Sequence, residues 1–293
     1  MKSIVLVTGA GTGIGKLSAL ALAQAGHTVY ASLRDIHGRN AAKAAELKAT
    51  SRNIHIVELD VLSQASADAA VASILAEQGR LDVVMHNAGH LVVGPAEAYT
   101  PEEISKVFDT NFLGTQRVNR AVLPIMRKQE AGLVLWISST TVRGGFPPFL
   151  GPYAAAKAAM DSLAVSYAYE LARFGIETSI VVPGAFTRGT DHFPSAGKPA
   201  DAITAAGYAR YDGLMDQVGA RLSALTPEHA DPQAVADEVS RIVGLPQGRR
   251  PMRSVIDFVG DGAEEVTALA EQVRIDFAER IGIADLLTPS VAH

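Results

Sequence analysis

The sequence predicts an α/β fold, in which a doubly wound parallel sheet of about seven strands carries helices on both faces. Three observations predict it. Short β-rich segments alternate with longer helical patterns, these short segments are apolar on both sides, and a glycine-rich turn follows the first of them. Parallel neighbours need a crossover connection, and the helical patterns between the strands supply one each time.

The elements follow one another as strand and helix pairs along a single domain, 1–293. The expected strands are 3–8, 28–33, 54–59, 81–86, 132–138, 176–182 and 253–260. The expected helices are 13–25, 39–50, 63–78, 101–128, 153–174, 231–245 and 263–281. Segment 186–226 has weak periodicity and is expected to be a lid insertion over the edge of the sheet, and 246–293 forms a C-terminal extension.

The amino-acid composition limits the classes of partner that the protein is expected to bind. A hydrophobic content of 48% fills a single core, and the net charge of -5 comes without a dense basic run, which favours a small molecule over nucleic acid or an anionic membrane. The chain has no cysteine, which removes disulfides, thiolate zinc sites and cysteine nucleophiles and makes the cytoplasm the expected location. No apolar run approaches the length that spans a bilayer.

The first turn of the chain has the composition of an anion site. Gly9, Gly11, Gly13 and Gly15 follow the first strand directly, where a helix must begin. Glycines allow the tight turn and a close approach of backbone N–H groups to a pyrophosphate at the helix N-terminus. The spacing differs from G-x-G-x-x-G, and Lys16 lacks the glycine spacing of a Walker loop. The alternative is a β-to-α turn that binds no ligand.

Tyr153 and Lys157 are the second candidate site. Four residues apart on a helix, the phenol and the ammonium share one face. A phenol titrates near pH 10, so we expect the adjacent cation to lower its pKa. A lowering of about three units corresponds to roughly 4 kcal/mol and makes the tyrosine a usable proton shuttle. The alternative is an exposed helical pair without a chemical role.

Further motifs stand in a recognisable order around these two. They are "TGAGTGIG" at 8–15, Asp60 after the third strand, "HNAG" at 86–89, Asn111, "ISS" at 137–139, "YAAAK" at 153–157 and "VPGAFT" at 182–187. With them the chain resembles the short-chain dehydrogenase/reductase family over 2–245. The resemblance implies a Rossmann-like fold and hydride exchange between a nicotinamide dinucleotide and a carbonyl or alcohol.

The resemblance also implies residue roles. Four segments are expected to contact the cofactor: the glycine loop, the residues after the third strand at the adenine, the "NAG" turn, and the end of the sixth strand at the nicotinamide. Their residues are Gly9, Thr12, Gly13, Ile14, Gly15, Asp60, Val61, Asn87, Ala88, Gly89, Pro183, Gly184 and Thr187. Tyr153 exchanges the proton, Lys157 also holds the ribose hydroxyls, Ser139 polarises the substrate oxygen and Asn111 keeps a water of the proton relay.

Two positions depart from the family pattern. The family commonly places its serine one residue later, at Thr140, so Ser138 and Thr140 stay open beside Ser139. His86 replaces the usual asparagine and is expected to be structural. His86 and His90 flank a loop without a third ligand, and we predict no catalytic metal.

The end of the second strand bears on the cofactor. An acid there suits a free ribose hydroxyl, whereas an arginine suits a 2'-phosphate. Leu33 stands at the acid's position and Arg34 follows it, which predicts NADP(H), with Ser32 and Arg34 on the phosphate. Because Asp35 comes next and could face a ribose, NAD(H) stays open.

Aromatic residues of the loop at 140–152 and of the lid indicate an apolar substrate. The expected pocket residues are Phe146, Phe149, Phe186, Phe193, Tyr208 and Tyr211. The leading interpretation is an NADP(H)-dependent reductase of ketones or aldehydes, and the alternatives are an NAD-linked alcohol dehydrogenase and a catalytically silent nucleotide sensor. Because family members pack their equivalents of helices 101–128 and 153–174 between subunits, we expect a homodimer or homotetramer.

Overall fold

The computed structural model describes residues 2–186, 188–190 and 192–289. Its sheet has seven strands, all parallel, in the order β3-β2-β1-β4-β5-β6-β7. The strands are β1 (Ile4–Val7), β2 (Thr28–Leu33), β3 (Ile54–Glu58), β4 (Val83–His86), β5 (Gly132–Ile137), β6 (Ile176–Pro183) and β7 (Arg253–Ile256). The doubly wound parallel sheet is therefore confirmed.

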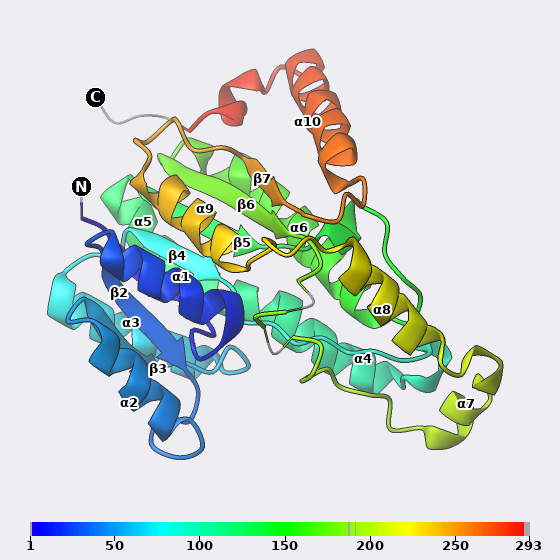
Figure 1. Ribbon diagram of the computed structural model, residues 1–293. Coiled ribbons are helices and arrows are strands. Elements are labelled where there is room, and N and C mark those ends of the chain that lie inside the picture. Colours follow the sequence, from blue (N-terminus) through cyan, green and yellow to red (C-terminus); the bar gives the residue numbers. More distant parts are fainter. Residues whose placement is uncertain (1, 187, 191, 290–293) are drawn as a thin grey trace.

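Ten α-helices accompany the sheet in the described residues (Figure 1). They are α1 (Gly13–Gln24), α2 (Ala41–Thr50), α3 (Gln64–Gln78), α4 (Pro101–Phe108), α5 (Gly114–Gln129), α6 (Gly151–Ala172), α7 (Ala202–Ala206), α8 (Leu214–Leu225), α9 (Gln233–Gly244) and α10 (Ala263–Arg280). None of the helices in these residues is both long and apolar enough to cross a membrane.

The alternation of side chains along each strand builds two cores. On β1, Leu6 packs in the cluster formed with α3, α5 and α6, whereas Val5 and Val7 pack in the cluster formed with α1, α2 and α9. Successive side chains of a strand point to opposite faces, so a wholly apolar strand supplies both layers. Burial on both faces is what holds the strand ends in fixed positions.

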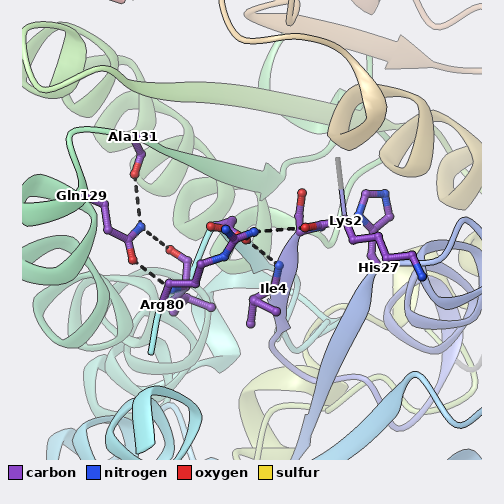
Figure 2. A network of polar contacts seen from close by, with 9 residues as sticks. Lys2, Ile4, His27, Arg80, Gln129 and Ala131 are labelled. Atoms are coloured by element: carbon purple, nitrogen blue, oxygen red, sulfur yellow. Dashed lines mark hydrogen bonds and ion pairs between the residues drawn. The ribbon is translucent and has the colours of Figure 1, made fainter. Parts of the chain in front are cut away.

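The amino edge of the sheet is closed by polar contacts (Figure 2). The Asp82 carboxylate accepts from the Ile4 backbone N–H at 2.7 Å, and Arg80 donates to the Lys2 carbonyl at 3.1 Å. The Gln129 amide bonds both backbone groups of Leu81, at 3.0 and 2.9 Å. These contacts join β1, β4 and α5 at the amino ends of the strands. A ligand is therefore expected at the opposite, carboxyl ends, as in other open α/β sheets.

Three elements differ from the sequence prediction. The helix expected at 101–128 is divided by a π-helical turn, Asp109–Leu113, between α4 and α5. α8 is a regular helix inside the lid, which is expected to be weakly periodic. Leu214, Val218, Leu222 and Leu225 recur at helical spacing along it, although none of its residues is buried. β7 ends early because the Asp257 carboxylate accepts from three backbone N–H groups, those of 259, 260 and 261.

The lid is fastened to the body at its base. Backbone hydrogen bonds of 2.9 Å join Gly197 to Leu91 and to Val93. Beyond this point α7 and α8 extend past the sheet on the side of α4 (Figure 1).

Candidate functional site

One long cavity of about 590 Å³ runs along the carboxyl ends of the strands. Its middle lies at β1 and β4, where the strand order reverses, the usual ligand position of an open α/β sheet. We call one end the basic end, lined by Arg34, Asn40 and Lys43, and the other the tyrosine end, lined by Ser139, Tyr153, Lys157, Phe186 and Phe193. The volume is within the ordinary range of small-molecule sites.

The glycine loop has the geometry that an anion needs. Gly9 and Gly13 have φ values of 66° and 53°, where only glycine is free of strain. A Cβ on Gly9 would stand 2.9 Å from the Ala88 Cα, whereas the nearest atom to a Cβ on Gly13 would be Thr190 Cβ at 4.0 Å. The Thr12 side chain makes no capping bond to α1. The first N–H groups of α1 therefore face the cavity without a side-chain cap, as a pyrophosphate requires.

Asn87 locks this loop to the end of β4. Its side-chain amide donates to the carbonyls of Thr8 and Gly9, at 2.9 and 3.0 Å. The Thr8 hydroxyl in turn accepts from the backbone N–H of Asn87 and of Ala88. Gly15 leaves room for the Asn87 side chain, because a Cβ at position 15 would lie 2.3 Å from the Asn87 amide nitrogen. Gly15 itself does not line the cavity.

The basic end carries two cations, and Leu33 stands at the position where an acid would favour NAD(H). Arg34 and Lys43 both line the cavity, whereas Asp35 turns away, with φ 51°, and accepts from the Arg39 backbone N–H at 3.0 Å. Lys43 escaped the sequence prediction; its place on the first turn of the helix after Arg34 was the available signal. Ser32 is fully buried, its hydroxyl has no partner in the described structure, and it does not reach the cavity.

The adenine contact and the "NAG" turn lie where the motifs predict. Asp60, Val61, Asn87, Ala88 and Gly89 line the middle of the cavity, together with Ile14 of the glycine loop. Pro183 and Gly184 line it from the end of β6, whereas Thr187 is outside the described residues.

Asn111 lies in the π-helical turn and not on the cavity wall. Its side-chain amide exchanges hydrogen bonds with the backbone of His90, at 3.0 and 3.1 Å, and donates to the Val107 carbonyl at 2.9 Å. π-helical turns are rare and occur frequently at functional sites. Here the π-helical turn brings the buried Asn111 side chain against the segment that follows Gly89. The hydrogen bonds of Asn111 therefore hold that segment of the cavity wall in place.

Tyr153 and Lys157 are both buried at the first turns of α6, which rules out an exposed helical pair. The Lys157 ammonium lies 6.0 Å from the centroid of the Tyr153 ring and donates to the Ile137 carbonyl at 2.9 Å. Both groups line the cavity. The two side chains thus face one space, as their spacing predicts.

The direction of the tyrosine pKa corrects the sequence argument. Burial raises the pKa of Tyr153 to about 12, and the opposing effect comes from its hydrogen bond with Ser139. Burial also lowers the pKa of Lys157 to about 8, although Asp161 acts against this. Removal from water disfavours both charged forms, and this effect exceeds the attraction expected from the spacing alone.

The three candidate hydroxyls of 138–140 point to three different partners. Ser139 is hydrogen-bonded to Tyr153 and also lines the cavity. The Ser138 hydroxyl donates to the buried Asp161 carboxylate at 2.8 Å, and the Thr140 hydroxyl is bonded to Asp261. Ser139 is therefore the hydroxyl that stands beside the phenol.

Asp161 organises the wall behind this site. It lies one turn after Lys157 on α6 and forms a two-bond ion pair with Arg253 of β7, at 2.7 and 2.6 Å. Both side chains are buried, and Arg143 approaches the same carboxylate at 3.6 Å. These cations, with the Ser138 hydroxyl, outweigh the effect of burial and lower the pKa of Asp161. The turn that carries Ser139 is thereby joined to the far strand of the sheet.

His86 is a core residue. Its ring is buried, lies 2.7 Å from the Asn119 side-chain oxygen and packs against Trp136, and burial lowers its pKa to about 4.

The expected pocket aromatics separate into two groups. Phe146, Phe186 and Phe193 line the tyrosine end. Phe149, Tyr208 and Tyr211 do not line it; the Phe149 ring lies edge-on to both tyrosine rings, at 6.5 and 5.9 Å. This second group packs the lid against the loop at 140–152.

Two histidines at the tyrosine end escaped the sequence prediction. His192 of the lid lies edge-on to Tyr153, with ring centroids 5.6 Å apart, and His90 lines the cavity beside it. Burial lowers the pKa of both rings, that of His192 to about 4, so both are neutral at physiological pH. Their signal in the sequence was position alone, next to "NAG" and after "VPGAFT".

Comparison with known proteins decides the family. The family model described as short chain dehydrogenase matches residues 3–199, more than half of the chain. The chain belongs to the short-chain dehydrogenase family. The match covers the glycine loop, Ser139, Tyr153, Lys157 and the first part of the lid, and it ends before α7.

Similar curated proteins come from bacteria and mammals. A 3-ketodihydrosphingosine reductase of Bacteroides thetaiotaomicron is 37% identical over 64% of this chain and 65% of its own length. Human retinol dehydrogenase 8 is 36% identical over 61% of the chain and 58% of its own length. The chain thus spans less than two thirds of these relatives. The uncharacterized oxidoreductase YusZ of Bacillus subtilis is 30% identical over 82% of the chain and 84% of its own length.

Solved structures confirm the fold. A short-chain dehydrogenase from Streptomyces avermitilis superposes with a TM-score of 0.74 at 30% identity, covering 96% of this chain and 97% of its own. Actinorhodin polyketide ketoreductase, solved with NADPH, has a TM-score of 0.71 at 26% identity, over 89% of this chain and 97% of its own. The chain therefore contains an NAD(P)-dependent oxidoreductase domain with the Rossmann-like fold of this family.

Proposed function

We propose that the protein is an NADP(H)-dependent carbonyl reductase that also works in reverse as a secondary-alcohol dehydrogenase. The observation that carries this proposal is the hydrogen-bonded pair of Tyr153 and Ser139, which faces the apolar end of a cavity with two cations at its other end. A carbonyl oxygen placed between the two hydroxyls is polarised by Ser139 and receives its proton from Tyr153. NADPH, when bound along the cavity, would supply the hydride for the carbonyl carbon.

The raised pKa of Tyr153 suits the role of proton donor. A phenol with a pKa of about 12 stays protonated at neutral pH, and it gives up the proton only as negative charge develops on the substrate oxygen. The phenolate that remains lies near the Lys157 ammonium and keeps the hydrogen bond from Ser139. In the oxidative direction the Tyr153 phenolate would accept the proton of the alcohol.

The basic end supports NADP(H) over NAD(H). Arg34 and Lys43 present two cations to the cavity, and Asp35, the acid that would repel a 2'-phosphate, is engaged with the backbone of its own loop. The serine dehydrogenase that superposes with a TM-score of 0.69 at 26% identity was solved with NADP+. The alternative, an NAD-linked alcohol dehydrogenase, predicts tighter binding of NADH than of NADPH.

Hydrocarbon-rich substrates fit the tyrosine end. Leu91, Leu150, Leu222 and the three phenylalanines line it, and the two histidines beside them are neutral. The relatives are named for 3-ketodihydrosphingosine and retinol, and another is a 17-beta-hydroxysteroid dehydrogenase of Homo sapiens. These names refer to apolar molecules that bear a ketone or a hydroxyl group, which supports the same class here.

A panel of ketones and aldehydes of increasing chain length tests the proposal, with the nicotinamide absorbance followed for NADPH and NADH. We expect oxidation of NADPH, with kcat/KM rising as the substrate becomes more apolar. A protein that binds NADPH but turns over none of the panel would support the catalytically silent nucleotide sensor instead. Turnover with NADH that exceeds turnover with NADPH would contradict the cofactor assignment.

A further inference from the structure

The last α-helix of the described residues carries an apolar face that nothing in the described structure covers. α10 stands at the margin of the molecule (Figure 1) and lies beyond the residues that the family model matches. Ala263, Thr267 and Ala278 point to the body and are buried. The large apolar side chains of Val266, Leu269, Val273, Phe277 and Ile281 are each 45–67% exposed.

These five side chains form a continuous surface, which we call the α10 stripe. Their spacing of three and four residues places them on one side of the helix, along about four turns. Single exposed apolar residues are ordinary, but a contiguous row of this length marks a surface that meets a partner.

The charges beside the stripe argue against a membrane surface. α10 carries five acidic residues and two arginines, so an anionic bilayer would repel it. The charges are also unevenly placed. Glu264 and Glu265 stand exposed in the first turn, and Arg280, exposed in the last turn, forms no ion pair with any described residue.

We propose that the α10 stripe pairs with the α10 stripe of a second copy of this chain, antiparallel, about a two-fold axis at Val273. In this arrangement Val273 meets its own counterpart, and Leu269 meets Phe277 of the partner on both sides of the axis. The first turn of each helix lies against the last turn of the other, which brings Glu265 near the opposite Arg280. A parallel pair would instead place Glu264 and Glu265 against their own copies.

The pairing is self-complementary in size as well as in charge. The smallest side chain of the central row, Val273, lies on the axis, and the larger Leu269 and Phe277 lie four residues to either side, about 6 Å along the helix. Two-fold interfaces need such a match, because one surface supplies both sides of the contact.

A single cysteine tests the axis directly, because the natural chain contains none. Val273→Cys is expected to form a disulfide-linked dimer under mild oxidation, since residues on a two-fold axis come close to their own copies. Ala268→Cys is the matched control: it is also exposed on α10 but lies on another side of the helix. Failure of Val273→Cys to link, or equal linking of both variants, would overturn the proposal.

Charge exchange tests the direction of the pair. Arg280→Glu is expected to weaken dimerisation about fivefold to tenfold, as measured by light scattering over a dilution series, and Glu265→Arg with Arg280→Glu is expected to restore it. Thermal unfolding of each variant shows that it still folds. A wild-type protein that stays monomeric while sedimenting with phosphatidylcholine vesicles would assign the stripe to a membrane and refute the pairing.

Discussion

The glycine-loop half and the lid half of the cavity are held in place by different means. Around the glycine loop, positive φ angles, close backbone packing on Ala88 and the hydrogen bonds of Asn87 leave no alternative geometry. In the lid, α7 and α8 have no buried residue, and one of the contacts that hold them is the bond from the Tyr208 hydroxyl to Glu97 at 2.8 Å. We therefore expect the glycine-loop half to keep one shape and the lid half to adapt to its ligand.

The largest effect is expected where the backbone is most constrained. Gly9→Ala adds a Cβ 2.9 Å from the Ala88 Cα at a φ of 66°, so the loop must move and the Kd for NADPH should rise about 100-fold or more. Gly213→Ala in the lid is the matched control, because its φ is 74° but the nearest atom to its Cβ is 4.0 Å away. Calorimetric titration with NADPH should show no change for that variant. Equal losses in both would remove the contrast between the halves.

Burial of Lys157 predicts a pH dependence of stability. In the unfolded chain Lys157 titrates near 10.5, whereas in the folded chain its pKa is about 8. Between these values the unfolded state holds a proton that the folded state has lost, so the free energy of unfolding rises with pH, by roughly 3 kcal/mol over the window.

Denaturant melts at pH 7.5 to 10.5 measure this rise, and Lys157→Met should lack most of it. Tyr153 acts in the opposite sense at higher pH: its folded pKa of about 12 exceeds the unfolded value of 10.0, so stability falls between these pH values. A wild-type curve that is flat, or that Lys157→Met leaves unchanged, would show that the ammonium is not held in a dry site.

The basic end allows a test of the glycine-loop half that distinguishes NADPH from NADH. Arg34→Ala and Lys43→Ala should each raise the Kd for NADPH about tenfold while changing the Kd for NADH less than about twofold, because each loses a charge contact to the 2'-phosphate alone. Arg39→Ala is the control, since Arg39 pairs with Asp35 and does not line the cavity. Parallel losses for both cofactors would point to a role in shaping the loop instead.

The smallest effect is expected in the lid. Tyr208→Phe removes an exposed hydrogen bond to Glu97, which should lower the free energy of unfolding by less than about 1 kcal/mol. KM for an apolar ketone should change more than kcat, because Tyr208 does not line the cavity and would act only through the position of the lid. A large loss of kcat in this variant would mean that the lid helps to build the reaction site.

The same contrast explains how far the sequence could be interpreted. The sheet, the glycine loop and the Tyr153–Lys157 pair follow from local rules, since glycines at positive φ, apolar strands and four-residue spacing all leave marks in the residue order. The sequence prediction missed α8, although Leu214, Val218, Leu222 and Leu225 recur at helical spacing, because the lid segment as a whole, 186–226, has weak periodicity. The division of 101–128 at Asn111 left no mark, since a π turn keeps helical composition.

Burial is the second quantity that residue order conceals. The four-residue spacing alone predicts that Lys157 lowers the pKa of Tyr153, but both groups are buried and the loss of water is the larger effect on each pKa. Ser32, expected on a phosphate, is covered completely, and Lys43, not expected at all, faces the cavity. His192 comes to Tyr153 through the fold of the lid, which no local pattern indicates.

The central claim is that the hydroxyl of Tyr153 carries the proton of a hydride transfer, and Tyr153→Phe tests it most directly. Single-turnover oxidation of NADPH with a reducible ketone should slow at least about 10²-fold to 10⁴-fold, while the Kd for NADPH stays within about twofold of the wild type. A variant that binds NADPH and reduces the ketone at the wild-type rate would contradict the account.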